Sequence, residues 1–446
     1  MIDLKNIYCA SSLHDCCGVV FEYEGKFFRA LLPRGIRLFD LLNRDGWMQC
    51  LFENGLARIQ RSDLYIPGYQ GIIELERLSP IVPPFMWTTN MLGEAGLVVC
   101  KLSKELLRRG LVIWDLKGMT NMTFSAQRGP LLIDIGAIYT IQELENHILR
   151  ISEQSLFEQI ISSFYAPIWL ACGPFRHLHS VERLLEYRKT GEQGFAFVAS
   201  LLRRLTFGWK IIPGLIKAKS LLYSHQYEKF YDFINYKIQI LHNKSVSRIH
   251  ADMSEQSHFK MLGQDLKAII QILDGSLGGM DNKVVFDLFP EEEIGLNIAE
   301  YTNANVYLVT SNCTKAEEIY AWRKKKYKNV LPILCDIWDR SFQSCSVLRE
   351  GCDLVYILPD IFEAAVAAKV PLDFVGRVLS MLTRRVAVVG IGQPGDKANF
   401  PSFVCPPESN GDPVEFVRST VGKYFRSHEI VRSRESSKAT ILILRK

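Results

Sequence analysis

The last third of the chain alternates short apolar runs with segments of helical spacing. The runs are KVVFDLF (283–289), NVYLVT (305–310), VLPILCD (330–336), CDLVYIL (352–358), RRVAVVGI (384–391) and ATILILRK (439–446). Strands that read as continuous apolar stretches are expected when helices cover both faces of a sheet. The pattern therefore predicts a doubly wound α/β sheet. Its last two strands, HEIVRS and ATILILRK around Arg434 to Ser437, are expected to form an antiparallel hairpin that closes the sheet.

The first third has a different pattern. Residues 18–31 alternate around the turn dipeptide Glu24-Gly25, which predicts an opening β-hairpin. Apolar residues recur at helical spacing over residues 37–42 and 89–109. A second β-rich stretch then follows Gly110, with the segments LVIWDL, MTF and PLLIDIGAIY. This mixture predicts an α+β module.

Between these regions, nearly every window from Glu143 to about Asp274 has helical spacing, and SLGGMD (276–281) has the composition of a hinge. We therefore expect three parts. Residues 1–142 are expected to form an N-terminal α+β module, residues 143–275 a helical connector, and residues 276–446 a Rossmann-like domain.

Composition narrows the class of protein. The 446 residues, 48% of them hydrophobic, suffice for two or three domains with their own cores. The net charge of +5 is spread thinly apart from the run at 323–326, which predicts a solvated helix face and no nucleic-acid partner. The 11 cysteines lack any Cys-x-x-Cys spacing, so we expect reduced thiols and no metal. The longest apolar stretch is too short to span a bilayer and no signal peptide is evident, which favours a cytoplasmic protein without membrane contact.

Several segments follow one another in an order that resembles a known family. They are the strand Gly18–Phe21, the segment Pro84–Trp87 before a helix at Leu92–Leu107, the loop from Ile113 to Asn121, the strand Pro130–Asp134, and the helix Ile160–Ile168. Together they resemble a bacterial family of two-part class I S-adenosylmethionine-dependent methyltransferases, often labelled nodulation-protein-like. The resemblance implies a Rossmann-like methyltransferase domain at residues 276–446, with S-adenosylmethionine as its cofactor.

The expected cofactor contacts are changed in this chain. In the family an acid ends the first strand, which matches Asp287, and glycines follow it, where this chain has Phe289 and Glu293. Glycines let the backbone approach a ligand closely, whereas Phe289 adds bulk there. Glu293, with two further glutamates, places negative charge near the expected carboxylate of the cofactor, and like charges at about 4 Å repel by roughly 1–4 kcal/mol.

The second strand of the family ends in an acid that accepts hydrogen bonds from both ribose hydroxyls, but here it ends in Thr310. A hydroxyl cannot replace a bidentate acceptor. The third strand keeps its acid, Asp336. After the fourth strand the family has paired histidines, where this chain has Asp360 and Glu363, two weak candidates for a general base. We expect weak or absent S-adenosylmethionine binding.

The N-terminal module also contains residues that suit a phosphotransferase. Asp115, Asn121 and Asp134 provide two carboxylates and an amide oxygen, which suit a hard divalent cation in the arrangement of protein kinases. The interval from Asp115 to Asn121 is one residue longer than the kinase pattern, no glycine-rich loop precedes it, and Lys26 is only a nominal counterpart of the kinase lysine. The favoured interpretation is a kinase-like remnant in which these side chains cap loops.

Three functions remain open at this stage. The leading one is a degenerate methyltransferase-family protein, a pseudoenzyme that serves as a partner or small-molecule-binding subunit, with a protein partner or a second copy of itself. The second is an active S-adenosylmethionine-dependent methyltransferase acting on a small metabolite. The third is an atypical phosphotransferase at Asp115, Asn121 and Asp134.

Overall fold

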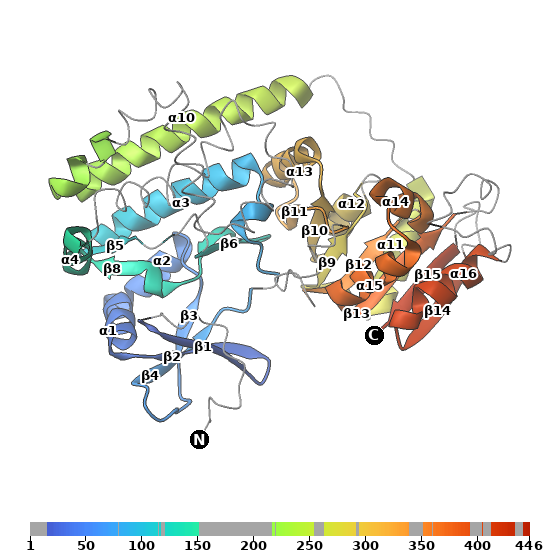
Figure 1. The fold of residues 1–446 in the computed structure, drawn as a ribbon, viewed down its shortest axis with the longest axis horizontal. Helices are drawn as coiled ribbons and strands as arrows, with labels where there is room; N and C mark the ends of the chain where they lie inside the picture. The colour runs from blue at the N-terminus through green and yellow to red at the C-terminus, as the bar shows by residue number, and fades with distance from the viewer. Residues whose placement is uncertain are drawn as a thin grey trace. The chain divides into compact units, whose positions relative to one another are not determined.

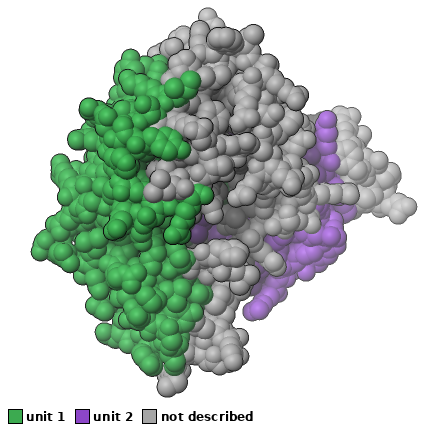
Figure 2. Space-filling view, turned by 60° about the vertical axis from the view of Figure 1, so that its left-hand side comes forward, with its two compact units in different colours: residues 1–78, 83–85, 89–247 green, residues 79–82, 86–88, 248–446 purple. Residues whose placement is uncertain are grey.

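A computed structural model describes most of the chain, and it divides into two compact units, coloured separately in Figure 2. Unit 1 comprises residues 1–78, 83–85 and 89–247, and unit 2 comprises residues 79–82, 86–88 and 248–446. The described residues are 16–78, 80–114, 116, 121–150, 216–218, 220–253, 263–290, 294–338, 351–358, 360–392, 404, 412–432 and 440–446.

Unit 2 is built on a seven-stranded, mostly parallel sheet (Figure 1). Its strands are β9 (Val284–Asp287), β10 (Asn305–Thr310), β11 (Val330–Leu334), β12 (Cys352–Ile357), β13 (Thr383–Ile391), β14 (Ser427–Arg432) and β15 (Thr440–Arg445). Their spatial order is β11-β10-β9-β12-β13-β15-β14, and β15 pairs antiparallel with both β13 and β14. The doubly wound sheet and the closing antiparallel hairpin predicted from the sequence are both confirmed.

The apolar runs form these strands because both faces of the sheet are covered. Helices α11 (Gly263–Leu277), α12 (Ile294–Tyr301), α13 (Cys313–Lys325), α14 (Ile361–Ala368), α15 (Leu372–Leu382) and α16 (Pro413–Thr420) belong to this unit. One buried cluster joins Leu273 of α11 and Ile298 of α12 to strand residues such as Val285 and Leu354. Pro332 lies in β11, an edge strand, where a residue without an N–H is tolerated.

The segment 276–281 is the end of a helix. Helix α11 stops at Leu277, and Gly278 and Gly279 have positive φ angles of 68° and 104°. The N–H of Gly279 donates to the carbonyl of Asp274 at 3.0 Å, and the N–H of Met280 donates to the Asp274 carboxylate at 2.8 Å. The chain therefore turns tightly from α11 into β9 within unit 2.

Unit 1 begins with a four-stranded antiparallel sheet of order β1-β2-β4-β3, from β1 (Gly18–Tyr23), β2 (Lys26–Leu31), β3 (Ile59–Ser62) and β4 (Gly71–Leu75). The predicted hairpin is confirmed, since β1 pairs with β2 and the turn residues Glu24 and Gly25 have φ angles of 50° and 72°. Two central residues with positive φ fit the twist of a hairpin. The sequence interpretation did not find β3 and β4.

The rest of unit 1 combines helices with two short β-pairs. Its described helices include α1 (Pro33–Leu42), α2 (Trp47–Glu53), α3 (Thr89–Leu107), α4 (Ile141–Arg150) and most of α10 (Tyr227–Met253), whose last residues are assigned to unit 2. Short 3-10 turns are η2 (Arg44–Gly46), η4 (Ile135–Ala137) and η3 (Pro84–Met86), of which Met86 is assigned to unit 2. Strand β5 (Leu111–Ile113) pairs with β8 (Ile138–Thr140), and β6 (Met122–Ser125) pairs with β7 (Gly129–Leu132). Helices α1 and α3 match the helical segments expected at 37–42 and 89–109, and β5 to β8 match the β-rich segments expected after Gly110, whereas α2 was not predicted. The Ile160–Ile168 helix lies outside the described residues.

In the part of the chain that the structure describes, no helix is both long enough and apolar enough to cross a membrane. The kinase-like character of unit 1 and the three-part division of the chain stay predictions.

Candidate functional site

The candidate site of unit 2 lies at the carboxyl ends of its parallel strands. The strand order reverses between β9 and β12, and open α/β sheets bind ligands at such a reversal. Asp287 is the last residue of β9 and Thr310 the last of β10, while Asp336 and Asp360 closely follow β11 and β12. The fold therefore brings these four predicted residues to one edge of the sheet.

Asp287 is held by groups of the protein itself. It is 2% exposed, and its Oδ2 accepts a hydrogen bond from the hydroxyl of Tyr356 at 2.8 Å, while Oδ1 accepts from the N–H of Phe289 at 3.0 Å. Tyr356 lies directly opposite Asp287 on the neighbouring strand β12. Burial, and then the charge of Asp287, raise the pKa of Tyr356 well above its ordinary value, so Tyr356 stays protonated and can donate. This bond spans the point where the strand order reverses.

A glycine brings helix α12 close to this pair. A Cβ at Gly295 would lie 2.4 Å from Cδ2 of Leu308, 3.1 Å from Oδ2 of Asp287 and 3.2 Å from the Tyr356 hydroxyl. In dinucleotide-binding folds the third glycine of the motif permits such close packing of helix and strand. Gly295 and Tyr356 were not identified from the sequence; a glycine in the helix directly after the strand was the available signal for Gly295.

The positions that the family fills with glycine are Phe289 and Glu293. Phe289 is partly buried, its N–H is bound to Asp287, and the following Pro290 is buried. Glu293 and the two glutamates before it lie outside the described residues. The turn after β9 therefore directs a backbone N–H of Phe289 at the strand's own carboxylate.

At the end of β10, Thr310 closes a turn. Its Oγ1 accepts from the N–H of Asn312 at 3.1 Å, and the Asn312 side chain accepts from Lys315 N–H at 3.1 Å, which caps helix α13. Asp336 is partly buried after β11, and its Oδ1 accepts from the N–H of Trp338 at 3.0 Å. Both predicted contact residues thus take part in local turns.

The two candidates for a general base have different surroundings. Asp360 caps helix α14, because its Oδ1 accepts from the N–H of Phe362 at 2.8 Å, and a Cβ at Gly392 would lie 2.1 Å from its Oδ2. Burial raises the pKa of Asp360, although backbone hydrogen bonds from Phe362 and Gly392 oppose this effect. Glu363 is exposed in the first turn of the same helix.

In unit 1 the hairpin of β6 and β7 places Asn121 and Asp134 at the same end. The N–H of Ile133 donates to the carbonyl of Asn121 at 3.0 Å. Oδ1 of Asp134 accepts from Nη1 of Arg29 at 2.6 Å and from the N–H of Gly136 at 2.7 Å. Asp115 lies outside the described residues. Among the described residues no group of three or more His, Cys, Asp or Glu could hold a metal ion.

The cation beside Asp134 is Arg29, which was not identified from the sequence. Lys26, the nominal counterpart of the kinase lysine, is instead paired with Glu74 at 3.0 Å, with 60% of its side chain exposed. Both residues lie on β2, but only Arg29 is buried, at 3% exposure.

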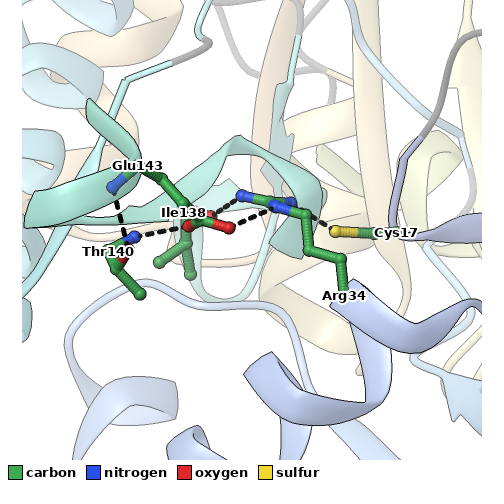
Figure 3. Close-up of polar contacts among 5 residues, drawn as sticks. All are labelled: Cys17, Arg34, Ile138, Thr140 and Glu143. Atoms are coloured by element: carbon green, nitrogen blue, oxygen red, sulfur yellow. Dashed lines mark hydrogen bonds and ion pairs between the residues drawn. The ribbon is translucent and has the colours of Figure 1, made fainter. Parts of the chain in front are cut away.

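A second polar cluster in unit 1 centres on Arg34 at the start of α1, drawn in Figure 3. Its guanidinium donates to Glu143 Oε1 at 3.0 Å, to the Ile138 carbonyl at 2.7 Å, and to the Cys17 sulfur. Thr140 and Glu143 form a reciprocal capping box at the start of α4. Burial raises the pKa of Cys17 to about 12 despite the nearby Arg34, so the thiol is protonated at neutral pH. The cluster joins three chain segments and is structural.

No protein-family model matches the sequence, and no curated protein does. Among solved structures, the chain is similar to that of the bifunctional kinase-methyltransferase WbdD, at 13% identity and a TM-score of 0.33 over 44% of this chain and 45% of that one. It is also similar to the aminoglycoside resistance methyltransferase NpmB1 (14% identity, TM-score 0.29, 40% of this chain and 92% of that one). A third is magnesium protoporphyrin IX methyltransferase from Synechocystis PCC 6803 with bound SAM (14% identity, TM-score 0.26, 41% and 78%). The matched region spans less than half of the WbdD chain.

Proposed function

We propose that unit 2 keeps a methyltransferase-like fold but does not transfer methyl groups efficiently, and that the protein serves as a partner or small-molecule-binding subunit. The observation that carries the proposal is the state of Asp287. Its two oxygens accept hydrogen bonds from Tyr356 and from the backbone of Phe289, and the residue is 2% exposed. The family resemblance assigns this carboxylate to the cofactor, but here it already accepts hydrogen bonds from groups of the protein.

The energetic consequence can be bounded. A hydrogen bond to a charged group contributes about 1.5–3 kcal/mol. A ligand that binds Asp287 must displace the hydrogen bond that the Tyr356 hydroxyl donates to it. That loss alone weakens binding by roughly 10- to 150-fold. The packing of Gly295 against the same carboxylate leaves little room for an approaching group. This loss of binding free energy adds to the effects of the bulky Phe289 and the negatively charged Glu293 that follow β9 in the sequence.

The ribose end gives independent support. S-adenosylmethionine carries a ribose diol, for which a carboxylate is the fitting acceptor, and β10 ends instead in Thr310, whose Oγ1 accepts from Asn312. Asp336 keeps a carboxylate near the expected adenine position, but its Oδ1 accepts from Trp338. We infer that these residues do not fit S-adenosylmethionine, so no reaction step is assigned to that cofactor.

Isothermal titration with S-adenosylmethionine and S-adenosylhomocysteine tests the proposal. We expect no saturable heat at ligand concentrations up to about 1 mM, where a Kd of 1 mM corresponds to only about 4 kcal/mol. An active methyltransferase titrated alongside controls for ligand quality. Micromolar binding by the wild-type protein would contradict the proposal.

One observation favours the alternative, an active methyltransferase acting on a small metabolite. The raised pKa of Asp360, at the end of β12, is the kind of shift that suits a general base. This alternative requires Asp336 as a cofactor contact, so the Asp336→Ala variant should lose any turnover measured with radiolabelled methyl donor. An unchanged rate in that variant excludes the alternative.

A further inference from the structure

The Arg29–Asp134 pair joins two parts of unit 1 that are far apart in the sequence. Arg29 comes from β2 of the four-stranded sheet, and Asp134 directly precedes η4, after the β6–β7 hairpin. Nη1 of Arg29 lies 2.6 Å from Oδ1 of Asp134. The arginine side chain is 4% exposed and the aspartate side chain 31%. A buried guanidinium requires a counter-charge, and Asp134 supplies it.

The same carboxylate also organises the backbone that follows it. The N–H of Gly136 donates to Asp134 Oδ1 at 2.7 Å, which caps the short turn η4. One oxygen atom therefore receives hydrogen bonds from both the sheet and the turn. Removing either Arg29 or Asp134 would disconnect β2 from η4 at this point.

The surroundings of Asp134 are otherwise suited to a hard cation. The bond from Ile133 N–H to the carbonyl of Asn121 brings an amide-bearing residue to the same hairpin end. Carboxylate and amide oxygens are the ligands that Mg²⁺ and Ca²⁺ take in proteins. A divalent ion at Asp134 would have to share the carboxylate with a guanidinium, and the two positive charges would repel each other.

We propose that Arg29 is an internal cation that takes the place of a divalent metal ion at Asp134. The guanidinium neutralises the carboxylate and holds the turn η4 against the four-stranded sheet without any bound ligand. Unit 1 therefore keeps Asp134 closed to a divalent metal ion. The proposal concerns unit 1 and does not depend on the function proposed for unit 2.

The first test is the melting temperature of the full-length protein with 10 mM Mg²⁺ or Mn²⁺, each with and without ATP. We expect shifts of less than about 1 °C in the wild type, because a ligand that does not bind the native state does not stabilise it. A rise of several degrees with metal and ATP would overturn the proposal. The wild-type measurement is decisive even where a variant fails to fold.

The second test uses variants of the pair. Arg29→Met leaves the carboxylate without its cation, and we expect the melting temperature to fall by on the order of 10 °C. The double variant Arg29→Met/Asp134→Leu replaces the pair by apolar groups and should regain part of that loss. Lys26→Met is the matched control, since Lys26 lies on the same strand in an exposed pair with Glu74. It should shift the melting temperature by no more than about 1 °C.

A metal titration distinguishes two interpretations of the Arg29–Asp134 pair. Either Arg29 takes the place of a metal ion, or the ion pair only stabilises the fold. In Arg29→Met, Asp134 is released from the guanidinium, so 10 mM Mn²⁺ should raise the melting temperature, and it should not do so in Arg29→Met/Asp134→Leu. Hydrogen exchange of residues 27–31 and 133–137 reports the same effect locally. If Mn²⁺ leaves the melting temperature of Arg29→Met unchanged, or if Arg29→Met/Asp134→Leu is no more stable than Arg29→Met, the proposal is wrong.

Discussion

Each unit places an aspartate where a ligand-binding residue was expected, and each aspartate is satisfied from within the protein. Asp287 in unit 2 accepts a hydrogen bond from the neutral hydroxyl of Tyr356 and is 2% exposed. Asp134 in unit 1 forms an ion pair with the guanidinium of Arg29, and 31% of its side chain is exposed. In both units the donor comes from a strand distant in the sequence. The comparison teaches that an acid at the right position indicates a binding site only when its partners are known.

We expect the largest loss of stability when Asp134 is removed from the Arg29–Asp134 ion pair. Asp134→Ala removes the carboxylate that lies 2.6 Å from the buried guanidinium of Arg29, which should destabilise unit 1 by about 3–5 kcal/mol. Urea unfolding monitored by circular dichroism measures this loss. A loss below 1 kcal/mol would mean that water or another group compensates Arg29, and the contrast with Asp287 would disappear.

The neutral pair is expected to be less costly to break. Tyr356→Phe removes only the hydroxyl, so unit 2 should lose about 1–3 kcal/mol, since Asp287 keeps the N–H of Phe289. Tyr307→Phe is a suitable control, because Tyr307 is a buried tyrosine of β10 whose ring packs against Phe286. Equal losses in both variants would show that the hydroxyl of Tyr356 has no special role at Asp287.

A smaller effect should appear in the pH dependence of the two units. Burial raises the pKa of Asp360, whereas hydrogen bonds from Thr140 and the charge of Arg34 outweigh burial and lower the pKa of Glu143. A lowered pKa means that the native state binds fewer protons, so the contribution of Glu143 is present above its ordinary pKa of 4.5 and is lost as the pH falls. For Asp360 the sign is opposite, because its contribution is lost as the pH rises above its ordinary value of 3.8.

Unfolding of Glu143→Gln and Asp360→Asn between pH 3 and 7 measures these slopes. Glu143→Gln should weaken the loss of stability of unit 1 at low pH, while Asp360→Asn should not lose stability at pH 7, because asparagine can also cap α14. The same change of slope in both variants would contradict the opposite signs.

Much of the fold could be predicted from the sequence, because the apolar runs of unit 2 are long, separate and buried on both faces. Strand β3 was missed because three of the four residues of IQRS are polar, and β4 was missed because GIIEL is only five residues long. The positions of Asp287, Thr310 and Asp336 on one sheet edge follow from strand order alone. Their hydrogen-bond partners do not, because Tyr356 lies 69 residues from Asp287 and reads as an ordinary strand residue.

The same limit applies in unit 1. Arg29 lies 105 residues from Asp134, and the alternating hairpin pattern does not distinguish it from the exposed Lys26. A pairing over such a distance depends on how β2 and the β6–β7 hairpin pack, which residue types alone do not specify. The candidate acidic residues could therefore be found in the sequence, whereas the side chains that donate hydrogen bonds to them could not.

The most direct test of the account is the titration of the wild-type protein with S-adenosylhomocysteine. If Asp287 is held by Tyr356 and Phe289, and Thr310 closes a turn at the ribose position, no saturable binding should appear up to about 1 mM. A micromolar Kd, abolished by Asp287→Ala and kept in Tyr307→Phe, would show that Asp287 still serves a ligand and would contradict the account.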